Sequence, residues 1–241
     1  MPFWRKHRQT ENRLTKRDVV LSTPLTAAPA EGCTYSDVGM MILGFLLEGI
    51  SGVPLDVLVR STVCEPLKMG QTRFNPPLKQ ISTILPTEYS EDGSGPILGT
   101  VHDENARWLG GVSGHAGLFS TASDLATLAE CIMAGGITSG GTRVWQHPTI
   151  SLFTTPARIV DASSRCLGWD GYSQGCTGGD HATRGSFGHT GFTGTSLWID
   201  PPARRIVVLL TNAVHPRREH KKNGYFPWRR AIHEAAYALQ L

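Results

Sequence analysis

Several features are scarce in this 241-residue sequence, and each absence excludes a class of protein. Its five cysteines contain no C-x-x-C pair and are odd in number, so neither a structural zinc site nor a complete disulfide framework is predicted. No apolar run approaches the length that spans a bilayer, and the first residues lack the apolar segment of a signal peptide. As written, the chain is therefore expected to have no export signal, to be cytoplasmic and to show no membrane association.

The sequence also lacks a strong excess of either charge. Its 23 Lys and Arg residues and 20 Asp and Glu residues leave a formal net charge of only +3. Basic residues gather only near the ends of the chain, at 5–8 and 217–222. We interpret both clusters as solvated ends, so no nucleic-acid partner is expected. The remaining composition, 40% hydrophobic and 18% charged, is typical of a globular protein with one large domain or two lobes.

Regular structure is predicted from Tyr35 onward, after a poorly specified leading segment at residues 1–34. Apolar residues at helical spacing predict one helix from Ser36 to Ser51 and a second between Pro54 and Pro66. Residues 70–112 are rich in Pro, Gly and Thr and predict a long irregular excursion.

The second half of the chain predicts a helix, a hairpin and a terminal helix. A glycine-rich turn leads into a helix whose apolar face runs from Leu125 to Met133. Two strands, at about 191–199 and 205–211, are joined by a short turn and therefore predict an antiparallel hairpin. Apolar residues on one side of 227–241 predict the terminal helix.

Residues 188–194 read Gly-His-Thr-Gly-Phe-Thr-Gly, a glycine-spaced segment with hydroxyls and a histidine. Because missing side chains let a ligand backbone lie against a strand, this segment is predicted to form one wall of a hydrolytic site. Tyr35-Ser36-Asp37 precedes the first predicted helix, where Ser36 or Asp37 is expected to cap free backbone N–H groups.

Taken together, five segments follow the order found in the beta-lactamase-related serine hydrolases, which include penicillin-binding proteins and class C beta-lactamases. The segments are residues 35–48, 51–55, 65–74, 117–125 and 188–194. The chain resembles that family over roughly residues 18–241. The resemblance implies an α+β, beta-lactamase/transpeptidase-like fold, in which an antiparallel sheet flanked by helices adjoins a mostly helical lobe. It places the helical lobe at about 35–180, and the sheet strands with the C-terminal helix at about 181–241.

The resemblance also implies a mechanism in which a serine forms an acyl-enzyme with a peptide, lactam or ester carbonyl and water then releases it. Tyr35 would be the tyrosine of a Tyr-x-Asn motif, with Asp37 where asparagine is commoner. His189-Thr190-Gly191 would stand for the Lys-Thr-Gly strand, and the Phe192 N–H would enter the oxyanion hole. The implied catalytic residues are Tyr35 and His189; the implied substrate-binding residues are Asp37, Thr190, Gly191, Phe192 and Thr193. No cofactor is implied.

The nucleophile motif of that family, Ser-x-x-Lys, does not occur in this sequence, because none of the six lysines has a serine three positions before it. The family carries this motif upstream of the tyrosine, so the chain is expected to be N-terminally truncated and inactive alone. Without the nearby lysines, and with Asp37 close to Tyr35, the phenol is expected to stay protonated. The family implies a periplasmic or envelope parent of D-alanyl-D-alanine carboxypeptidase type.

Two other enzymatic interpretations start from single residues. Ser113 lies in Gly-Val-Ser-Gly-His, a near miss to the G-x-S-x-G nucleophile elbow, with His189 and Asp200 as candidate partners. The candidate ligands for a metal site are four loop residues whose spacing matches no recognised metal-binding motif. We interpret them as ordinary loop residues, so no metal is expected. They are His102, Asp103, His115 and His181.

A non-catalytic interpretation remains open as well. A chain that keeps the substrate-facing wall but lacks the nucleophile could bind peptidoglycan-like peptides or a protein partner without turnover, or be an inert fragment. The family's missing strands would leave the apolar run 206–210 as an exposed sheet edge, so self-association is expected.

Overall fold

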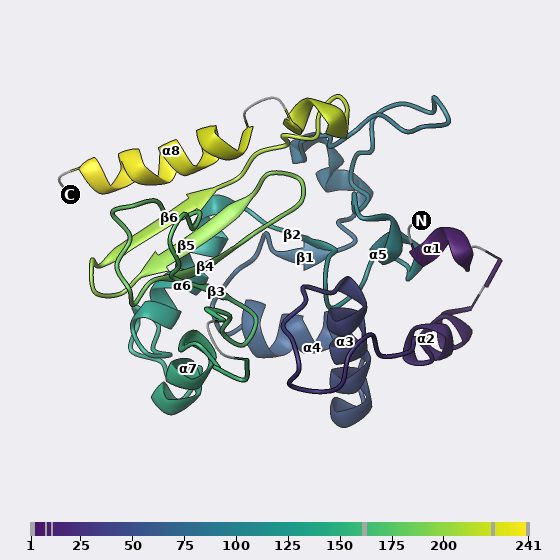
Figure 1. Ribbon diagram of the computed structural model, residues 1–241. Helices are drawn as coiled ribbons and strands as arrows, with labels where there is room; N and C mark the ends of the chain where they lie inside the picture. The colour runs from purple at the N-terminus through teal and green to yellow at the C-terminus, as the bar shows by residue number, and fades with distance from the viewer. Residues whose placement is uncertain (1–2, 8, 11, 161–162, 223–224, 240–241) are drawn as a thin grey trace.

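The computed structural model describes residues 3–7, 9–10, 12–160, 163–222 and 225–239. Its main sheet is antiparallel, with the strand order β3-β4-β5-β6, and helices cover both of its faces (Figure 1). The strands are β3 (Asp170–Gly171), β4 (Phe187–Thr190), β5 (Ser196–Asp200) and β6 (Arg205–Leu209). Helix α6 (Ala122–Met133) lies on one face and α8 (Tyr225–Ala238) on the other, while α7 (His147–Thr154) packs beside α6.

Alternation along β5 explains how both faces of the sheet are covered. Ile199 is fully buried against Ala129 and Ile132 of α6, whereas Ser196, an odd number of positions earlier, faces the opposite helix, where its hydroxyl lies 2.8 Å from Nε2 of His233. Successive side chains of a strand point to opposite faces, so one strand serves both layers.

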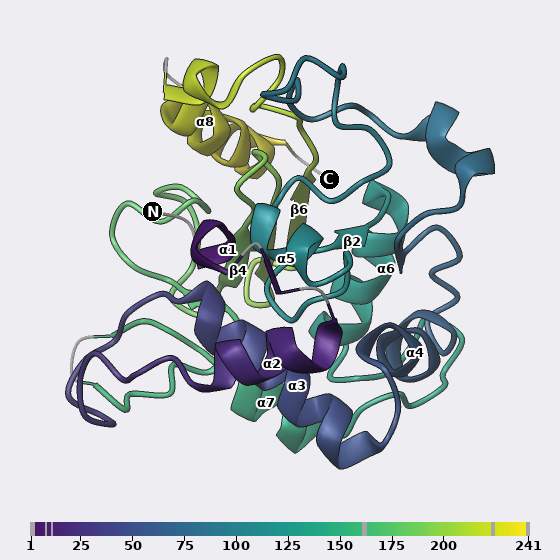
Figure 2. The same cartoon turned by 90° about the vertical axis from the view of Figure 1, so that its right-hand side faces the viewer.

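A mostly helical part adjoins the sheet. Helix α3 (Asp37–Ser51) packs against α2 (Arg13–Leu21), and the two lie side by side in Figure 2, with Val20, Met41 and Phe45 buried between them. The other elements of this part are short. They are α1 (Phe3–Lys6), α4 (Leu55–Val59), the π-helical turn Arg60–Cys64, the 3-10 helix Leu78–Thr83, α5 (Glu104–Trp108), and the paired strands β1 (Arg73–Phe74) and β2 (Leu118–Phe119). A second 3-10 helix, Arg218–Lys222, lies beside the start of α8 (Figure 1).

Most predicted elements are confirmed. The helix predicted at 36–51 is α3, the helix predicted to end at Met133 is α6, and the hairpin is β5 paired with β6. The helix predicted at 227–241 starts two residues earlier and ends at Ala238, and positions 240–241 fall outside the described residues.

Two sequence expectations were wrong. Regular structure begins before Tyr35, because α1 and α2 lie in the segment for which no element was predicted. The single strand predicted at about 191–199 is instead a turn followed by β5, and His189 and Thr190 belong to a separate strand, β4, which pairs antiparallel with β5.

Two glycines of this segment lie against side chains of the same hairpin. A Cβ on Gly188 would lie 2.2 Å from Cε3 of Trp198 on the neighbouring strand, and one on Gly191 would lie 2.2 Å from Oγ1 of Thr195. Both positions therefore favour glycine for packing within the hairpin.

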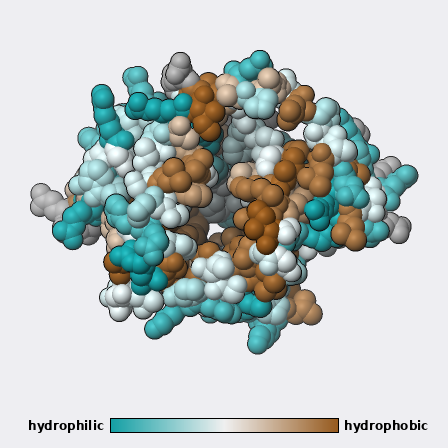
Figure 3. Space-filling model, turned by 90° about the horizontal axis from the view of Figure 1, so that it is seen from below, coloured by the Kyte–Doolittle hydropathy of each residue, from teal (hydrophilic) through white to brown (hydrophobic). Residues whose placement is uncertain are grey.

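Among the described residues, no single helix is long and apolar enough to cross a membrane. The helical segments Asp37–Ser51 and Leu55–Cys64, which meet at a bend of 78°, reach the required length and apolar composition only when they are taken together. Apolar side chains gather on the lower face of the molecule (Figure 3). Helices α3 and α7 contribute exposed apolar residues, namely Leu43, Leu46, Leu47, Ile50, Leu152 and Phe153.

Candidate active site

The start of α3 fixes the backbone next to Tyr35. Ser36 is the N-cap of this helix, and its Oγ accepts a hydrogen bond of 3.2 Å from the Gly39 N–H. Asp37 occupies the first turn, where a carboxylate is favoured by the helix dipole. Tyr35 precedes the cap and is 60% exposed. The predicted capping role of Ser36 is confirmed.

The end of β4 brings His189 to Tyr35, with the two ring centroids 6.0 Å apart. The Nδ1 of His189 lies 2.9 Å from the Thr190 carbonyl oxygen. Because a carbonyl oxygen can only accept, Nδ1 must carry the proton, and Nε2 is left to interact with a ligand. The structure thus places two residues together that are 154 positions apart in the sequence.

The electrostatics around Tyr35 keep its phenol protonated. Partial burial raises the pKa of Tyr35, and the negative charge of Asp37 raises it further. The Arg165 guanidinium, 5.4 Å from the ring centroid, acts in the opposite direction, but Asp170 is paired with Arg165 and also raises the pKa. Burial and Asp37 together therefore favour the protonated form of the Tyr35 phenol.

The turn after β4 holds Phe192 in a cage of cationic and aromatic groups. Its ring stacks on His102 at 5.6 Å, and the Lys221 Nζ lies 3.5 Å from the ring centroid. The same ammonium donates a hydrogen bond of 2.7 Å to the Phe192 carbonyl oxygen. Within the described part of the chain, the Phe192 N–H donates to no acceptor, so it is available to an incoming oxygen. Thr193 is held in the same turn by the Ala213 N–H, which donates to its carbonyl oxygen at 2.8 Å.

The groups around Phe192 are held in place by the buried carboxylate of Glu88. Glu88 is 8% exposed and accepts hydrogen bonds from the backbone N–H and Nε of Arg218 and contacts Nε2 of His102 at 2.8 Å. Burial alone would raise the pKa of Glu88, but the hydrogen bonds from Arg218 and His102 lower it to about 2. Arg218 also pairs with Glu104, 2.6 Å away.

Sequence reasoning missed Glu88, Arg218 and Lys221. The basic cluster at 217–222 was interpreted as a solvated end. In the structure, Arg218 binds the Glu88 carboxylate and Lys221 binds the carbonyl oxygen of Phe192. No local pattern marks this set, because Glu88 and Arg218 are 130 positions apart.

The alternative nucleophile elbow is not assembled. Ser113 is 6% exposed and its Oγ lies 2.8 Å from Nδ1 of His115, not near His189. Asp200 is fully buried, where it accepts hydrogen bonds from the Thr183 N–H and from the Tyr237 hydroxyl, at 2.8 and 2.7 Å.

The four loop residues considered for a metal do not meet as a set. His102 is bonded to Glu88 and His181 is exposed, whereas Nε2 of His115 lies 2.7 Å from Oδ1 of Asp103. A separate cavity of about 530 Å³ lies beside α4, and none of the residues assigned to the site from the sequence lines it. Its lining includes Arg60, Lys68, Arg73, Phe74 and Leu118.

Comparison with known proteins identifies the family of this chain. The sequence model of the beta-lactamase family matches residues 2–230. The chain belongs to the beta-lactamase family. The resemblance drawn from the ordered motifs is therefore confirmed, as is the α+β fold with its antiparallel sheet and flanking helices.

The relatives of this beta-lactamase-family chain are longer than the chain itself. A protein of Salmonella heidelberg (strain SL476), named "Putative D-alanyl-D-alanine carboxypeptidase", is 36% identical over 223 residues, which make up 86% of the chain but 51% of that protein. The chain thus spans about half the length of this relative.

Solved structures share the fold at lower sequence identity. EstCE1, described as a hydrolase with promiscuous acyltransferase activity, superposes with a TM-score of 0.64 at 23% identity, covering 91% of the chain and 60% of EstCE1. A penicillin-binding protein homologue from Caulobacter crescentus gives a TM-score of 0.60 at 18% identity, covering 92% of the chain and 64% of that protein.

Proposed function

We propose that this chain provides the substrate-aligning half of a D-alanyl-D-alanine carboxypeptidase-like site, and that it binds acyl peptides without turning them over alone. The observation that supports the proposal is the approach of Tyr35 to His189, 6.0 Å between ring centroids, in a sequence without Ser-x-x-Lys. The family name of the relatives supports a peptide ending in D-Ala-D-Ala as the ligand class.

Each proposed binding group has a separate task. The Thr190 hydroxyl aligns the peptide at the end of β4, and Nε2 of His189 faces the ligand. Gly191 lets the peptide approach the turn, while its own N–H donates to the Thr195 carbonyl oxygen. The Phe192 N–H, which has no acceptor among the described residues, donates to the ligand carbonyl oxygen. In a site completed by a Ser-x-x-Lys serine, the serine hydroxyl would attack that carbonyl, the leaving amine would depart with a proton, and water would hydrolyse the resulting ester.

Binding is tested by calorimetric titration of the full chain with a peptide ending in D-Ala-D-Ala. We expect saturable binding that His189→Ala and Thr190→Ala each weaken about tenfold, which corresponds to the loss of about 1.4 kcal/mol. His147→Ala, an exposed histidine on α7, is the matched control and should leave binding unchanged. An absence of binding, or equal losses in the control, would contradict the proposal.

Turnover is tested separately. Because the Tyr35 phenol is protonated and no Ser-x-x-Lys is present, chromogenic beta-lactams and short-chain esters should be hydrolysed no faster than in buffer. Measurable turnover that Tyr35→Phe abolishes would refute this part of the proposal.

We further propose that the chain associates with itself and that it acts in the cell envelope, as the carboxypeptidase name of its relatives suggests. Strand β6 is an outer strand of the four-stranded sheet in the described residues, so its free edge can pair with another chain. Sedimentation velocity at low and high protein concentration should show a concentration-dependent species, and a monomer with a sharp cooperative melt would speak against it.

A further inference from the structure

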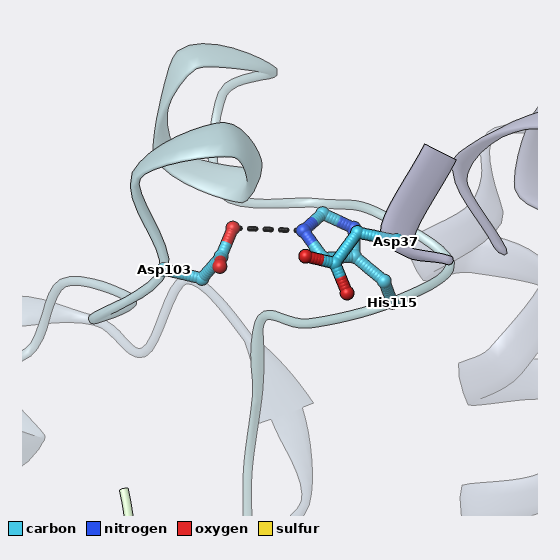
Figure 4. A group of neighbouring side chains, drawn as sticks. All are labelled: Asp37, Asp103 and His115. Atoms are coloured by element: carbon cyan, nitrogen blue, oxygen red, sulfur yellow. Dashed lines mark hydrogen bonds and ion pairs between the residues drawn. The ribbon is translucent and has the colours of Figure 1, made fainter. Parts of the chain in front are cut away.

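A histidine and two aspartates from three separate segments meet next to the start of α3. Asp37 lies in the first turn of α3, Asp103 is the N-cap of α5, and His115 lies in the loop before β2. One potential ligand atom from each side chain lies within 4.8 Å of the others. Figure 4 shows the Asp37 and Asp103 carboxylates near the imidazole ring of His115, with Asp103 bonded to it.

The position of the histidine is fixed from its other side. The His115 side chain is 2% exposed, and the buried Ser113 hydroxyl lies 2.8 Å from Nδ1, which turns Nε2 towards Asp103. The loop itself packs tightly on α3, since a Cβ on Gly114 would lie 2.1 Å from the Met40 carbonyl oxygen. The loop that carries His115 is thereby held against the helix that carries Asp37.

The charge of this cluster is not neutralised by lysine or arginine. In the described ranges, neither Asp37 nor Asp103 forms an ion pair with a lysine or an arginine, and the Asp37 carboxylate receives no side-chain hydrogen bond. Asp103 is the better supported of the two, because it also accepts a hydrogen bond of 2.8 Å from the Ala106 N–H. Two carboxylates beside a buried imidazole therefore form an acceptor-rich, negatively charged cluster.

We propose that Asp37, Asp103 and His115 bind a divalent transition-metal cation of the zinc type. His115 would ligate through Nε2 and each aspartate through one oxygen, with water in the remaining position, as in sites that use three protein ligands. In the structure, Nε2 of His115 donates to the Asp103 carboxylate, so ligation requires the ring proton to move to Nδ1, which then donates a hydrogen bond to Ser113 Oγ. Ligands at 2.0–2.1 Å from a tetrahedral ion lie about 3.3 Å apart, so small side-chain rotations would close the site.

This assignment differs from the metal interpretation weighed from the sequence. That interpretation sought ligands among histidines and Asp103 in neighbouring loops, whereas the structure adds Asp37, 66 positions before Asp103, and removes His102 and His181. The proposal concerns cation binding alone and does not depend on peptide binding at His189.

The test is titration of the tag-free, chelator-treated full chain with Zn²⁺ alone, followed calorimetrically. We expect one equivalent to bind, and we expect Asp37→Asn and His115→Gln each to weaken binding at least tenfold. Ser113→Ala should weaken it about tenfold to a hundredfold through loss of the orienting hydroxyl. The matched controls are the exposed residues Asp92 and His147, as Asp92→Asn and His147→Gln, which should have no effect.

A second probe separates this site from the thiols. Co²⁺ bound at oxygen and nitrogen ligands should give d–d absorption without a thiolate charge-transfer band, and Cys33→Ser, at the exposed cysteine, should leave the spectrum unchanged. Thermal melts without metal establish that each variant is folded before titration. No saturable binding by the wild-type chain, binding that survives both Asp37→Asn and His115→Gln in folded proteins, or binding that follows Cys33 would overturn the proposal.

Discussion

The buried Glu88 carboxylate should contribute a large share of the stability of this chain, and its contribution should disappear in acid. Its pKa in the folded protein is about 2, against an ordinary value of 4.5. A lowered pKa means that the unfolded chain binds the proton more readily, so folding is favoured above pH 4.5 and this advantage is lost as the pH falls through 2. At about 1.4 kcal/mol per pKa unit, the shift is worth about 3 kcal/mol at pH 7.

Glu88→Gln removes the charge while keeping the shape of the side chain. It leaves Arg218 with Glu104 as its carboxylate partner, and breaking a buried pair from one side costs about 3–5 kcal/mol, in agreement with the pKa-based figure. We therefore expect the variant to lose about 3 kcal/mol in urea unfolding at pH 7. The difference from the wild-type chain should shrink to about 1.5 kcal/mol at pH 3, because the wild-type carboxylate is then still mostly ionised in the folded state but almost fully protonated in the unfolded state.

The matched control is Glu91→Gln. Glu91 pairs with Arg5 at 3.1 Å, but its side chain is 83% exposed, so this variant should change the unfolding free energy by less than about 1 kcal/mol at either pH. A Glu88→Gln loss below about 1 kcal/mol at pH 7, or a loss that is the same at pH 7 and pH 3, would refute the reasoning.

Three further predictions follow from contacts within the sheet and the site. Gly188→Ala should destabilise the chain by about 1–3 kcal/mol in urea unfolding, because its Cβ would overlap Trp198, whereas Gly70→Ala, with open space around it, should have little effect; equal effects would contradict the packing argument. The ultraviolet difference titration between the wild-type chain and Tyr35→Phe should place the pKa of Tyr35 above 10, and a midpoint below 10 would show that Arg165 outweighs burial and Asp37. Burial and the charge of Arg229 lower the pKa of His233 to about 4, so stability should fall as the pH drops from 6.5 to 4, and a histidine NMR titration that finds His233 near 6.5 would be inconsistent with its burial.

Local signals in the sequence were enough to locate the helices that begin with a cap. The Ser36 cap, the apolar spacing and the Gly52 stop together predict α3, since each acts within a few residues. Helices α1 and α2 escaped prediction because α2 owes its place to packing of Val20 under α3, which is a tertiary contact.

The candidate site was recoverable only in part. Tyr35 and His189 were named from the order of family motifs, and the structure brings their rings together. The turn at 191–195 was predicted as strand because it runs without a break into the alternating residues 196–199, although Gly-Phe-Thr-Gly-Thr has no alternation of its own and β5 begins only at Ser196. The Glu88 contacts and the Asp37, Asp103 and His115 cluster depend on chain segments far apart in sequence, and no periodicity encodes such meetings.

The hydrogen bonds between Glu88 and Arg218 also determine when parts of the structure can form during synthesis of the chain. The carboxylate that supports the Phe192 turn leaves the ribosome 130 residues before the guanidinium that neutralises it. Until Arg218 has emerged, the chain carries an acidic group destined for the interior without its partner, and contacts of such long sequence separation form slowly. The turn that carries Phe192 is therefore among the last parts of the molecule to be stabilised, because the contacts of Arg218 and Lys221 form only after the end of the chain has been made.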